Sequence, residues 1–434
     1  MSVRNHAERY PRGRTMNSVK LNLASGDVIN VERGWEKESS NPSPLSASAA
    51  LRAAESKCLS PKYRIFILYP DETIKSEIPL DDIKTGGTYS ENYQDGQRRS
   101  LSFSLNDDAG KYLVGVNNFW VGTRLRLDLG VENELGELYW FEKGIFVITK
   151  ATCSEDSSGA KSTNITAGDK FALFEGKMGT IGDTLEIPVG SLIEDVIKNI
   201  LAMDAGNGYP YDSRSIVYHS SFSGKRTQTA ISKTSGETYG SVLLELATQL
   251  SAEVFYNSQG NLTFVPTSET TGDGDKPLLI NAVSEDGDID SLGFDFDFTS
   301  IVNRMIVTGA SNSSSAGVYK AVAVNDDPKS PLCYQRIGYR TGSVINDPNI
   351  SSQQLAKERA SYELRKVSIL KSSVSLNVAF NPLITVNNLM TVTDSHYGIV
   401  KKRFLIQSLS CSFDYSGTMA VSASSLDNIP FLTR

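Results

Sequence analysis

The residues that could do chemistry most directly are five aspartates that follow one another closely in the second half of the chain. They are Asp286, Asp288, Asp290, Asp295 and Asp297. Their spacing imitates the ligand order of an EF-hand calcium loop, but Ser291 stands where that loop has its glycine and Asp297 where it has a bidentate glutamate. Phenylalanines such as Phe294 alternate with the last two acids, which is typical of a strand with one solvated acidic face. We therefore predict an acidic surface here, and no bound metal.

Histidine and cysteine, the usual ligands and nucleophiles, are scarce. The chain has three histidines and four cysteines, and no two cysteines have the short spacing of a zinc or redox motif. His396 lies in an expected turn beside Asp394 and Tyr397, where solvation is a simpler interpretation than catalysis. The sequence contains no phosphate-binding loop, dinucleotide-binding glycine pattern or common hydrolase motif. These residue types favour a structural or binding protein without a cofactor over an enzyme.

Charge is distributed unevenly along the chain. The 434 residues carry 43 basic and 50 acidic side chains, a net charge of −7, which argues against coating nucleic acid as the main function. Residues 267–297 contain nine acids and one lysine, whereas residues 300–434 contain 14 basic and 8 acidic side chains, a net charge of +6. Two solvated surfaces would explain this pattern, and so would complementary faces used for assembly.

Residues 1–60 differ from the rest of the chain, and we expect them to form an N-terminal arm that is partly helical or flexible. Basic residues are followed by a polar stretch and then by an alanine-rich segment, in which Pro44 is placed to begin a helix through residues 51–58. The arm could dock onto a neighbouring subunit or be a flexible leader, and the sequence leaves both interpretations open.

Two-residue alternation of apolar and polar side chains dominates the segment that follows. It is clear in residues 101–105 and 123–129, while residues 139–149 indicate a hairpin or a bent strand with Gly144 at the corner. One-sided alternation of this kind predicts an antiparallel sandwich or barrel. We expect residues 61–175 to form a first tube-like β-barrel.

The apolar period changes to the helical one in residues 176–298, which we expect to be an insert with an acidic linker. Ser191 and Glu194 have the spacing of a capping box for a helix over residues 192–201. A second helix is expected at 238–252, and residues 255–265 indicate a hairpin. The insert is thus a helix–helix–hairpin module.

Alternation returns in residues 299–434, which we expect to form a second tube-like β-barrel. One helix interrupts it, capped by Ser351 with Gln354 and extending to about residue 367. The fold class is therefore mainly β (α+β), with two antiparallel β-barrel domains, the insert and the N-terminal arm.

Several segments, taken in order, resemble a known family. They are GIFVITK at 144–150, NITAGDKFALFEG at 164–176, YGSVLLELATQLSAEVFY at 239–256, GNLTFVP at 260–266, NLMTVTD at 388–394 and RFLIQSLS at 403–410. Together they resemble the first barrel, the helix–hairpin insert and the closing barrel of phage baseplate hub or tail hub proteins. The resemblance covers about residues 60–425, and residues 1–60 have no counterpart in it.

The resemblance implies a structural virion protein folded in the host cytoplasm. Hub proteins form a homotrimeric ring that connects the six-fold tail tube to the central spike or tip. The expected partners are therefore a tail tube or distal tail protein, a spike or tip protein and the tape-measure protein, with DNA only in transit through the lumen and no membrane. The five aspartates would then be candidates for the lumen wall, where they would repel DNA phosphates.

Two other functions stay open on the sequence. A carbohydrate-binding adhesin of a tail tip would need exposed aromatic side chains, and the three tryptophans are far apart in the chain. A β-rich glycan hydrolase would need a pair of carboxylates at a defined separation, which a single sequence does not reveal.

Overall fold

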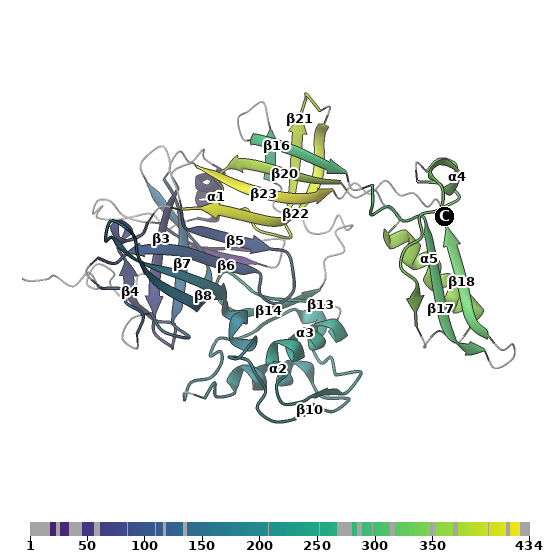
Figure 1. Ribbon diagram of the computed structural model, residues 1–434, viewed down its shortest axis with the longest axis horizontal. Coiled ribbons are helices and arrows are strands. Elements are labelled where there is room, and N and C mark those ends of the chain that lie inside the picture. Colours follow the sequence, from purple (N-terminus) through teal and green to yellow (C-terminus); the bar gives the residue numbers. More distant parts are fainter. Residues whose placement is uncertain are drawn as a thin grey trace, which may run out of the picture. The chain divides into compact units, whose positions relative to one another are not determined.

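The structure is a computed structural model, shown in Figure 1. It describes residues 18–22, 27–33, 46–55, 61–84, 86–108, 110–115, 119–132, 137–206, 208–250, 252–266, 280–283, 289–296, 298–312, 317–330, 332–347, 350, 352–367, 372–397, 399–413 and 417–425. Within these residues the chain divides into two units. The first lies within 1–291, 376–390 and 406–421, and the second within 292–375, 391–405 and 422–434.

Strands make up most of the regular structure. They are β1 (Ser18–Asn22), β2 (Val28–Arg33), β3 (Lys62–Leu68), β4 (Ile74–Ile78), β5 (Thr88–Asn92), β6 (Arg99–Asn106), β7 (Arg124–Glu132), β8 (Leu138–Glu155), β9 (Lys161–Asp169), β10 (Leu185–Ile187), β11 (Val217–Tyr218), β12 (Ile231–Lys233), β13 (Ala252–Tyr256), β14 (Leu262–Pro266), β15 (Ile280–Val283), β16 (Ile289–Phe296), β17 (Arg304–Asn312), β18 (Gly317–Val324), β19 (Ile345–Asn346), β20 (Ser372–Ala379), β21 (Leu389–Asp394), β22 (Ile399–Ser412) and β23 (Thr418–Ser425). The helices are α1 (Ala47–Glu55), α2 (Ile193–Ala202), α3 (Tyr239–Leu250), α4 (Tyr334–Ile337) and α5 (Gln353–Val367), with 3₁₀ turns η3 (Leu80–Asp82), η4 (Lys170–Phe174) and η5 (Ser220–Phe222). The predicted mainly-β class is confirmed.

An antiparallel sheet forms the centre of the first unit. Its strand order is β22-β5-β6-β9-β8-β7-β3-β4, and every pairing along this path is antiparallel. The alternation seen in the sequence has the expected result, because Leu101, Phe103 and Leu105 of β6 are buried while the side chains between them reach the other face. The apolar face of the sheet is thus the core of the unit.

β8 is one strand of 18 residues that changes register in its middle. Its pairing with β7 shifts between Leu127 and Asp128, opposite Gly144 and Glu142, so that Lys143 is the extra residue of a β-bulge. Gly144 has φ +143°, a conformation that residues with a Cβ rarely adopt. Of the two interpretations of residues 139–149, the strand with an irregularity at Gly144 is therefore correct.

The described part of residues 1–60 includes a β-hairpin and a helix. β1 pairs with β2, and β2 pairs with β8 of the same chain through Val31, Glu32 and Arg33. Ile29 and Val31 are fully buried. Residues 28–33 are thus part of the sheet of the first unit, an arrangement that the sequence did not suggest, and the expected helix is present as α1.

Residues 176–266 pack around a core of their own. α2 and α3 cover the β13–β14 hairpin, as Figure 1 shows in teal, and their buried side chains include Ile197, Val242, Leu246 and Phe264. Phe171 and Phe174 of η4 join this core from the end of β9, which attaches the insert to the sheet. The predicted helices and hairpin of this segment are confirmed.

Both predicted helix caps are wrong in detail. α2 begins at Ile193, so Leu192 stands at the cap position, and its side chain makes no cap hydrogen bond. The predicted cap residue Ser191 lies one position earlier, and its hydroxyl donates to the carbonyl of Pro188 at 2.8 Å. Glu194 pairs with Lys198 one turn later at 2.7 Å. In α5 the cap is Ser352, whose Oγ accepts from the N–H of Leu355 at 3.2 Å, and Ser351 lies outside the described residues.

A helix lies on a small sheet in the second unit. β17 pairs antiparallel with β18 and parallel with β19, and α5 runs along β17 and β18 in Figure 1. The contact is apolar: Ala356, Ala360 and Leu364 of the helix pack against Val307 and Ala321 of the strands. Small residues on the helix allow this close approach, so the solvent side of α5 is free to be polar.

Candidate functional site

The structure describes two of the five predicted acidic site residues. Asp290 and Asp295 are both exposed on β16. They are five positions apart, so the two-residue alternation of a strand places their side chains on opposite faces. Asp286, Asp288 and Asp297 lie outside the described residues. The shared lumen wall that we predicted for the five aspartates therefore stays a prediction.

The clearest concentration of charge is buried in the first unit. At its centre, the carboxylate of Glu91 on β5 faces Arg99 Nε at 3.4 Å and Lys143 Nζ at 3.8 Å. Arg99 also forms an ion pair with Asp27, and Lys143 donates to the carbonyl of Pro382 at 2.9 Å. All four charged side chains are almost completely buried. This cluster joins three parts of the chain that are distant in sequence.

Asp27 ties the N-terminal hairpin to the insert. Its carboxylate accepts from the N–H of Ser258 at 2.8 Å and from the Ser258 hydroxyl at 2.9 Å. Burial opposes ionisation, but Arg99, the Ser258 N–H and Lys143 together hold the pKa of Asp27 below its usual value. Because the charged form is stabilised on several sides, the group is a structural anchor.

A second buried cluster lies where the sheet meets the insert. Lys170 Nζ is 2.6 Å from Glu72 and 2.7 Å from Asp212, and it also donates to the carbonyl of Gly260 at 3.0 Å. Burial holds the pKa of Lys170 below its usual value, although Asp212 and Glu72 act in the opposite direction. Tyr256 completes the cluster by donating to Asp212 at 2.8 Å. Each donor of the ammonium group thus has an acceptor, as a buried lysine requires.

Two buried carboxyl groups have raised pKa values and deserve comparison with a catalytic acid. The pKa of Glu142 is raised to about 7, chiefly by burial. The charge of Arg126 opposes this rise, and the charge of Asp128 adds to it. Burial also raises the pKa of Asp169 to about 6, although Asp169 accepts three backbone N–H bonds, two of them from Arg98 and Arg99 at 2.8 and 2.9 Å. Glu142 lies in β8 and Asp169 ends β9, so both carboxyl groups are buried within the sheet. We therefore interpret both as structural groups.

Other candidate positions are open to solvent. His396 is exposed in the turn after Asp394, whose carboxylate accepts from the N–H of Tyr397 at 2.9 Å. His219 is also exposed; it precedes η5 and accepts from the N–H of Ser221. In the part of the chain that the structure describes, no three His, Cys, Asp or Glu side chains are grouped so that they could hold a metal ion. No helix among the described residues is both long and apolar enough to span a bilayer.

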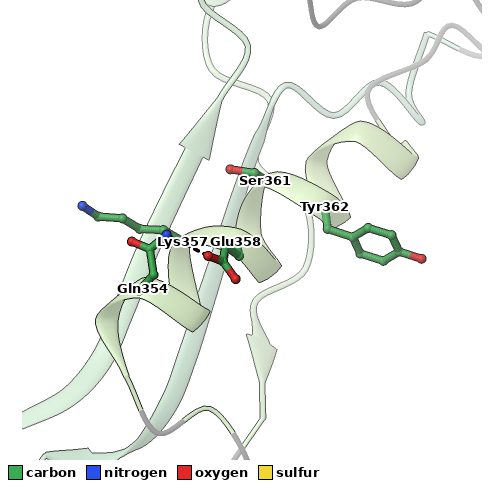
Figure 2. A pocket seen from close by; sticks show the side chains of 5 residues that line it. All are labelled: Gln354, Lys357, Glu358, Ser361 and Tyr362. Atoms are coloured by element: carbon green, nitrogen blue, oxygen red, sulfur yellow. Dashed lines mark hydrogen bonds between the residues drawn. The ribbon is translucent and has the colours of Figure 1, made fainter. Parts of the chain in front are cut away.

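An open hollow lies on the solvent side of α5, in the second unit (Figure 2). Figure 2 shows its lining of Gln354, Lys357, Glu358, Ser361 and Tyr362, with Tyr362 directed away from the other four. Gln354 donates to Glu358 at 2.7 Å, one turn away on the same helix. These are ordinary neighbours on a solvated helix face, so the hollow does not indicate a catalytic site.

Two solved structures with a similar architecture are tail proteins. The 43 kDa tail protein of prophage MuSo2 from Shewanella oneidensis aligns over 84% of this chain and 97% of its own, with a TM-score of 0.52 and 15% identity. A tail protein from Neisseria meningitidis MC58 aligns over 85% of this chain and 98% of its own, with a TM-score of 0.53 and 12% identity. The chain has the fold of phage tail proteins. The resemblance seen in the sequence is thus confirmed at the level of the fold.

The tail-protein fold also occurs in a longer chain. A structure of the Francisella PdpA–VgrG complex in its half-lidded form aligns over 86% of this chain and 59% of its own, with a TM-score of 0.51 and 10% identity. No family model matches the sequence, and no curated protein matches it. The likeness is therefore visible in the three-dimensional arrangement and not in sequence identity.

The buried ion clusters are the feature that the sequence analysis missed. Their signal was present, because Lys143 stands within the apolar run YWFEKGIFVI and Lys170 within AGDKFALF. A lysine inside an apolar segment is almost always paired when it is buried. The sequence does not show which carboxylates pair with them, since Glu72, Glu91 and Asp212 come from other strands and loops.

Proposed function

We propose that the chain is a structural component of a phage tail or baseplate, located in the virion and without catalytic activity of its own. The observation that carries this proposal is the fold likeness, which spans 97% of the Shewanella tail protein and 98% of the Neisseria tail protein. The buried ion clusters support it, because they join the N-terminal hairpin, the sheet, the insert and residues 382–387 into one firmly packed unit.

In more detail, we propose that the chain is a tail hub. Three copies form a ring that connects the six-fold tail tube, or a distal tail protein, to the central spike or tip, and the ring surrounds the channel for the tape-measure protein and DNA. A chain with this fold occurs in the Francisella PdpA–VgrG complex, which supports association of the present chain with other proteins. The exposed acids Asp290 and Asp295 are proposed as candidates for the lumen side of this ring.

The test is the state of assembly of the purified full chain. Its mass is 47.3 kDa, and a trimer is expected to have three times this mass, alone or after addition of the tube and spike proteins of the same phage. Electron micrographs are expected to show three-fold rings with a central hole. A chain that stays monomeric with and without those proteins would contradict the hub proposal, and turnover of an envelope polysaccharide would contradict the absence of catalysis.

A further inference from the structure

A lysine and two carboxylates are in direct contact in the buried cluster between the sheet and the insert. Lys170 Nζ is 2.6 Å from Glu72 Oε1 and 2.7 Å from Asp212 Oδ1. The side chains of Lys170 and Asp212 are completely buried, and only 2% of the Glu72 side chain is exposed. The three residues come from η4, the β3–β4 turn and the loop after α2. An amine, a carboxyl group that it can attack and a second carboxylate that can accept a proton therefore meet away from water.

The surroundings of Lys170 favour its neutral amine. Arg124, at 3.0 Å, and Arg214 also pair with Glu72, so in this network of ion pairs three cations share two carboxylates. Because an arginine does not release its proton, Lys170 is the cation that can relieve the excess of positive charge. Burial acts in the same direction and holds the pKa of Lys170 below its usual value. A desolvated lysine beside other cations is an activated nucleophile.

The two oxygens of the Asp212 carboxylate have different hydrogen-bond donors. Oδ1 accepts from the backbone N–H of Arg214 at 2.9 Å, and Oδ2 accepts from the hydroxyl of Tyr256 at 2.8 Å. A fixed N–H stabilises the negative charge that develops on an oxygen when an amine adds to the carboxyl carbon. Burial raises the pKa of Tyr256, so its hydroxyl keeps the proton that it can give to Oδ2. Oδ1 is thus held as the oxygen to be retained, and Oδ2 as the oxygen to leave.

Glu72 is placed to take a proton from the attacking amine. Burial opposes its ionisation, but Lys170 and Arg214 hold the pKa of Glu72 below its usual value. The group is therefore an ionised carboxylate, and its 2.6 Å contact with Lys170 Nζ is within the reach of a general base. Nucleophile, base, acid and oxyanion donor are all present around one carboxyl carbon.

We propose that Lys170 and Asp212 form an amide cross-link within the chain, with Glu72 as the base and Tyr256 as the acid. The Nζ of Lys170 bonds to the Cγ of Asp212, the bond from Cγ to Oδ2 breaks, and Oδ2 leaves as water. Two of the three ammonium protons are transferred to this oxygen through Glu72 and Tyr256, which both end in the protonation states in which they began. An ammonium group and a carboxylate thus become an amide and one water, without an oxidant or a cofactor. The bond forms once in each chain, so it involves no turnover and does not depend on the hub proposal.

Burial favours the product over the ion pair. Removing an ammonium group and a carboxylate from water is costly, and the amide that replaces them carries no charge. The amide N–H has an acceptor in the carbonyl of Gly260, which lies 3.0 Å from Lys170 Nζ, and the amide oxygen keeps the N–H of Arg214. The cross-link fastens the insert covalently to η4 at the end of β9.

Two other lysines of the chain have only part of this arrangement. Lys143 is completely buried, but its Nζ is 3.8 Å from Glu91 and closer to the carbonyl of Pro382, at 2.9 Å. Lys198 is 2.7 Å from Glu194, but its side chain is 54% exposed, so water keeps both groups charged. These lysines are internal controls, because neither combines close contact with burial and a second carboxylate.

The test is mass spectrometry of the folded full chain and of its tryptic peptides. The intact mass is expected to be lower, by one water molecule, than the mass that the sequence gives, 47.3 kDa. Trypsin does not cut after an acylated lysine, so residues 162–177 should be recovered joined to residues 199–214 through Lys170 and Asp212. Lys143 and Lys198 should be recovered unmodified in the same digest.

A folded wild-type chain with the full mass would overturn the inference. Loss of water without the joined peptides would also overturn it, because cyclisation at an Asp–Gly pair such as Asp95–Gly96 releases water as well. Either result would leave the hub proposal untouched, since that proposal is tested by the state of assembly.

The roles of the neighbouring side chains are tested by the extent of cross-linking after equal incubation. Glu72→Gln is expected to lower it at least about tenfold, because the base is lost. Glu194→Gln makes the same change beside the exposed Lys198 and should leave the extent unchanged. Equal cross-linking in Glu72→Gln and the wild type would overturn the role of Glu72. If Glu72→Gln misfolds, Tyr256→Phe tests the mechanism through its acid, and the wild-type mass still decides whether the bond forms.

Discussion

The guanidinium of Arg98 lies 2.8 Å from the carboxylate of Glu253, although 155 residues separate them in the chain. Both side chains are buried, and the guanidinium also stacks 3.8 Å from the centre of the Phe255 ring. Asn387 donates to the same carboxylate at 3.2 Å. One ion pair thus holds the sheet, the insert and a segment near the C-terminal end of the first unit together.

Removing one partner of this pair should destabilise the chain strongly. Glu253→Ala leaves a buried guanidinium without its counter-charge, so we expect the free energy of unfolding to fall by roughly 3–5 kcal/mol. Urea denaturation of the full chain measures the change. Glu194→Ala, which removes the exposed pair with Lys198, is the matched control and should cost about 0.5 kcal/mol or less. Equal effects of the two substitutions would contradict the structural role of Arg98 and Glu253.

Asp27 should determine whether the N-terminal hairpin stays on the sheet. In Asp27→Ala the buried Arg99 loses a counter-charge, and the N–H and hydroxyl of Ser258 lose an acceptor. We expect amide hydrogen exchange in residues 18–33 to become at least about tenfold faster, because local opening then costs less free energy. Ser18→Ala, at an exposed position of the same hairpin, is expected to leave the exchange unchanged. Unaltered exchange in Asp27→Ala would show that the β2–β8 pairing alone holds the hairpin.

Glu142 should make stability depend on pH. Its pKa is raised to about 7, chiefly by burial, from an ordinary value of 4.5. Between these values the native state keeps a proton that the unfolded state has released, so stability falls as pH rises through this window. Glu142→Gln removes this loss and is expected to be more stable than the wild type by on the order of 1–3 kcal/mol at about pH 8, with little difference at about pH 5.

The measurement is denaturant unfolding at several pH values across that window. Glu186→Gln, on the exposed face of β10, makes the same chemical change outside the sheet and should parallel the wild type. Parallel curves for the wild type and Glu142→Gln would mean that Glu142 is ionised in the native protein throughout.

Gly179 should tolerate no side chain. A Cβ at this position would lie 1.9 Å from the backbone carbonyl carbon of Phe174, and backbone atoms cannot give way as a flexible side chain can. Gly179→Ala is expected to cost about 3 kcal/mol or more and to loosen the junction of η4 with the insert. Gly182→Ala is the control, since a Cβ there meets nothing within 4 Å. Thermal unfolding of both variants checks this, and similar midpoints would contradict it.

The local character of each segment follows from its amino-acid pattern. Alternation in 101–105 and 123–129 predicted the strands β6 and β7, and the change to helical spacing after residue 190 predicted α2 and α3, because these periods follow from backbone geometry alone. Helix caps were predicted less well. Ser191 has the residue type of a cap, but its hydroxyl has a nearer acceptor in Pro188, which is visible only once the loop is folded.

Which distant residues meet depends on the folded arrangement of the whole chain. Lys143 and Lys170 stand out in the sequence as charges within apolar runs, yet their partners Glu91 and Asp212 come from other elements, and pattern within one segment contains no information about them. The same holds for contacts between strands. Each strand shows only alternate polar residues, and the register of the sheet places Ser102 beside Thr166. Register is set by the burial of the opposite face, a property of the whole sheet and not of any one strand.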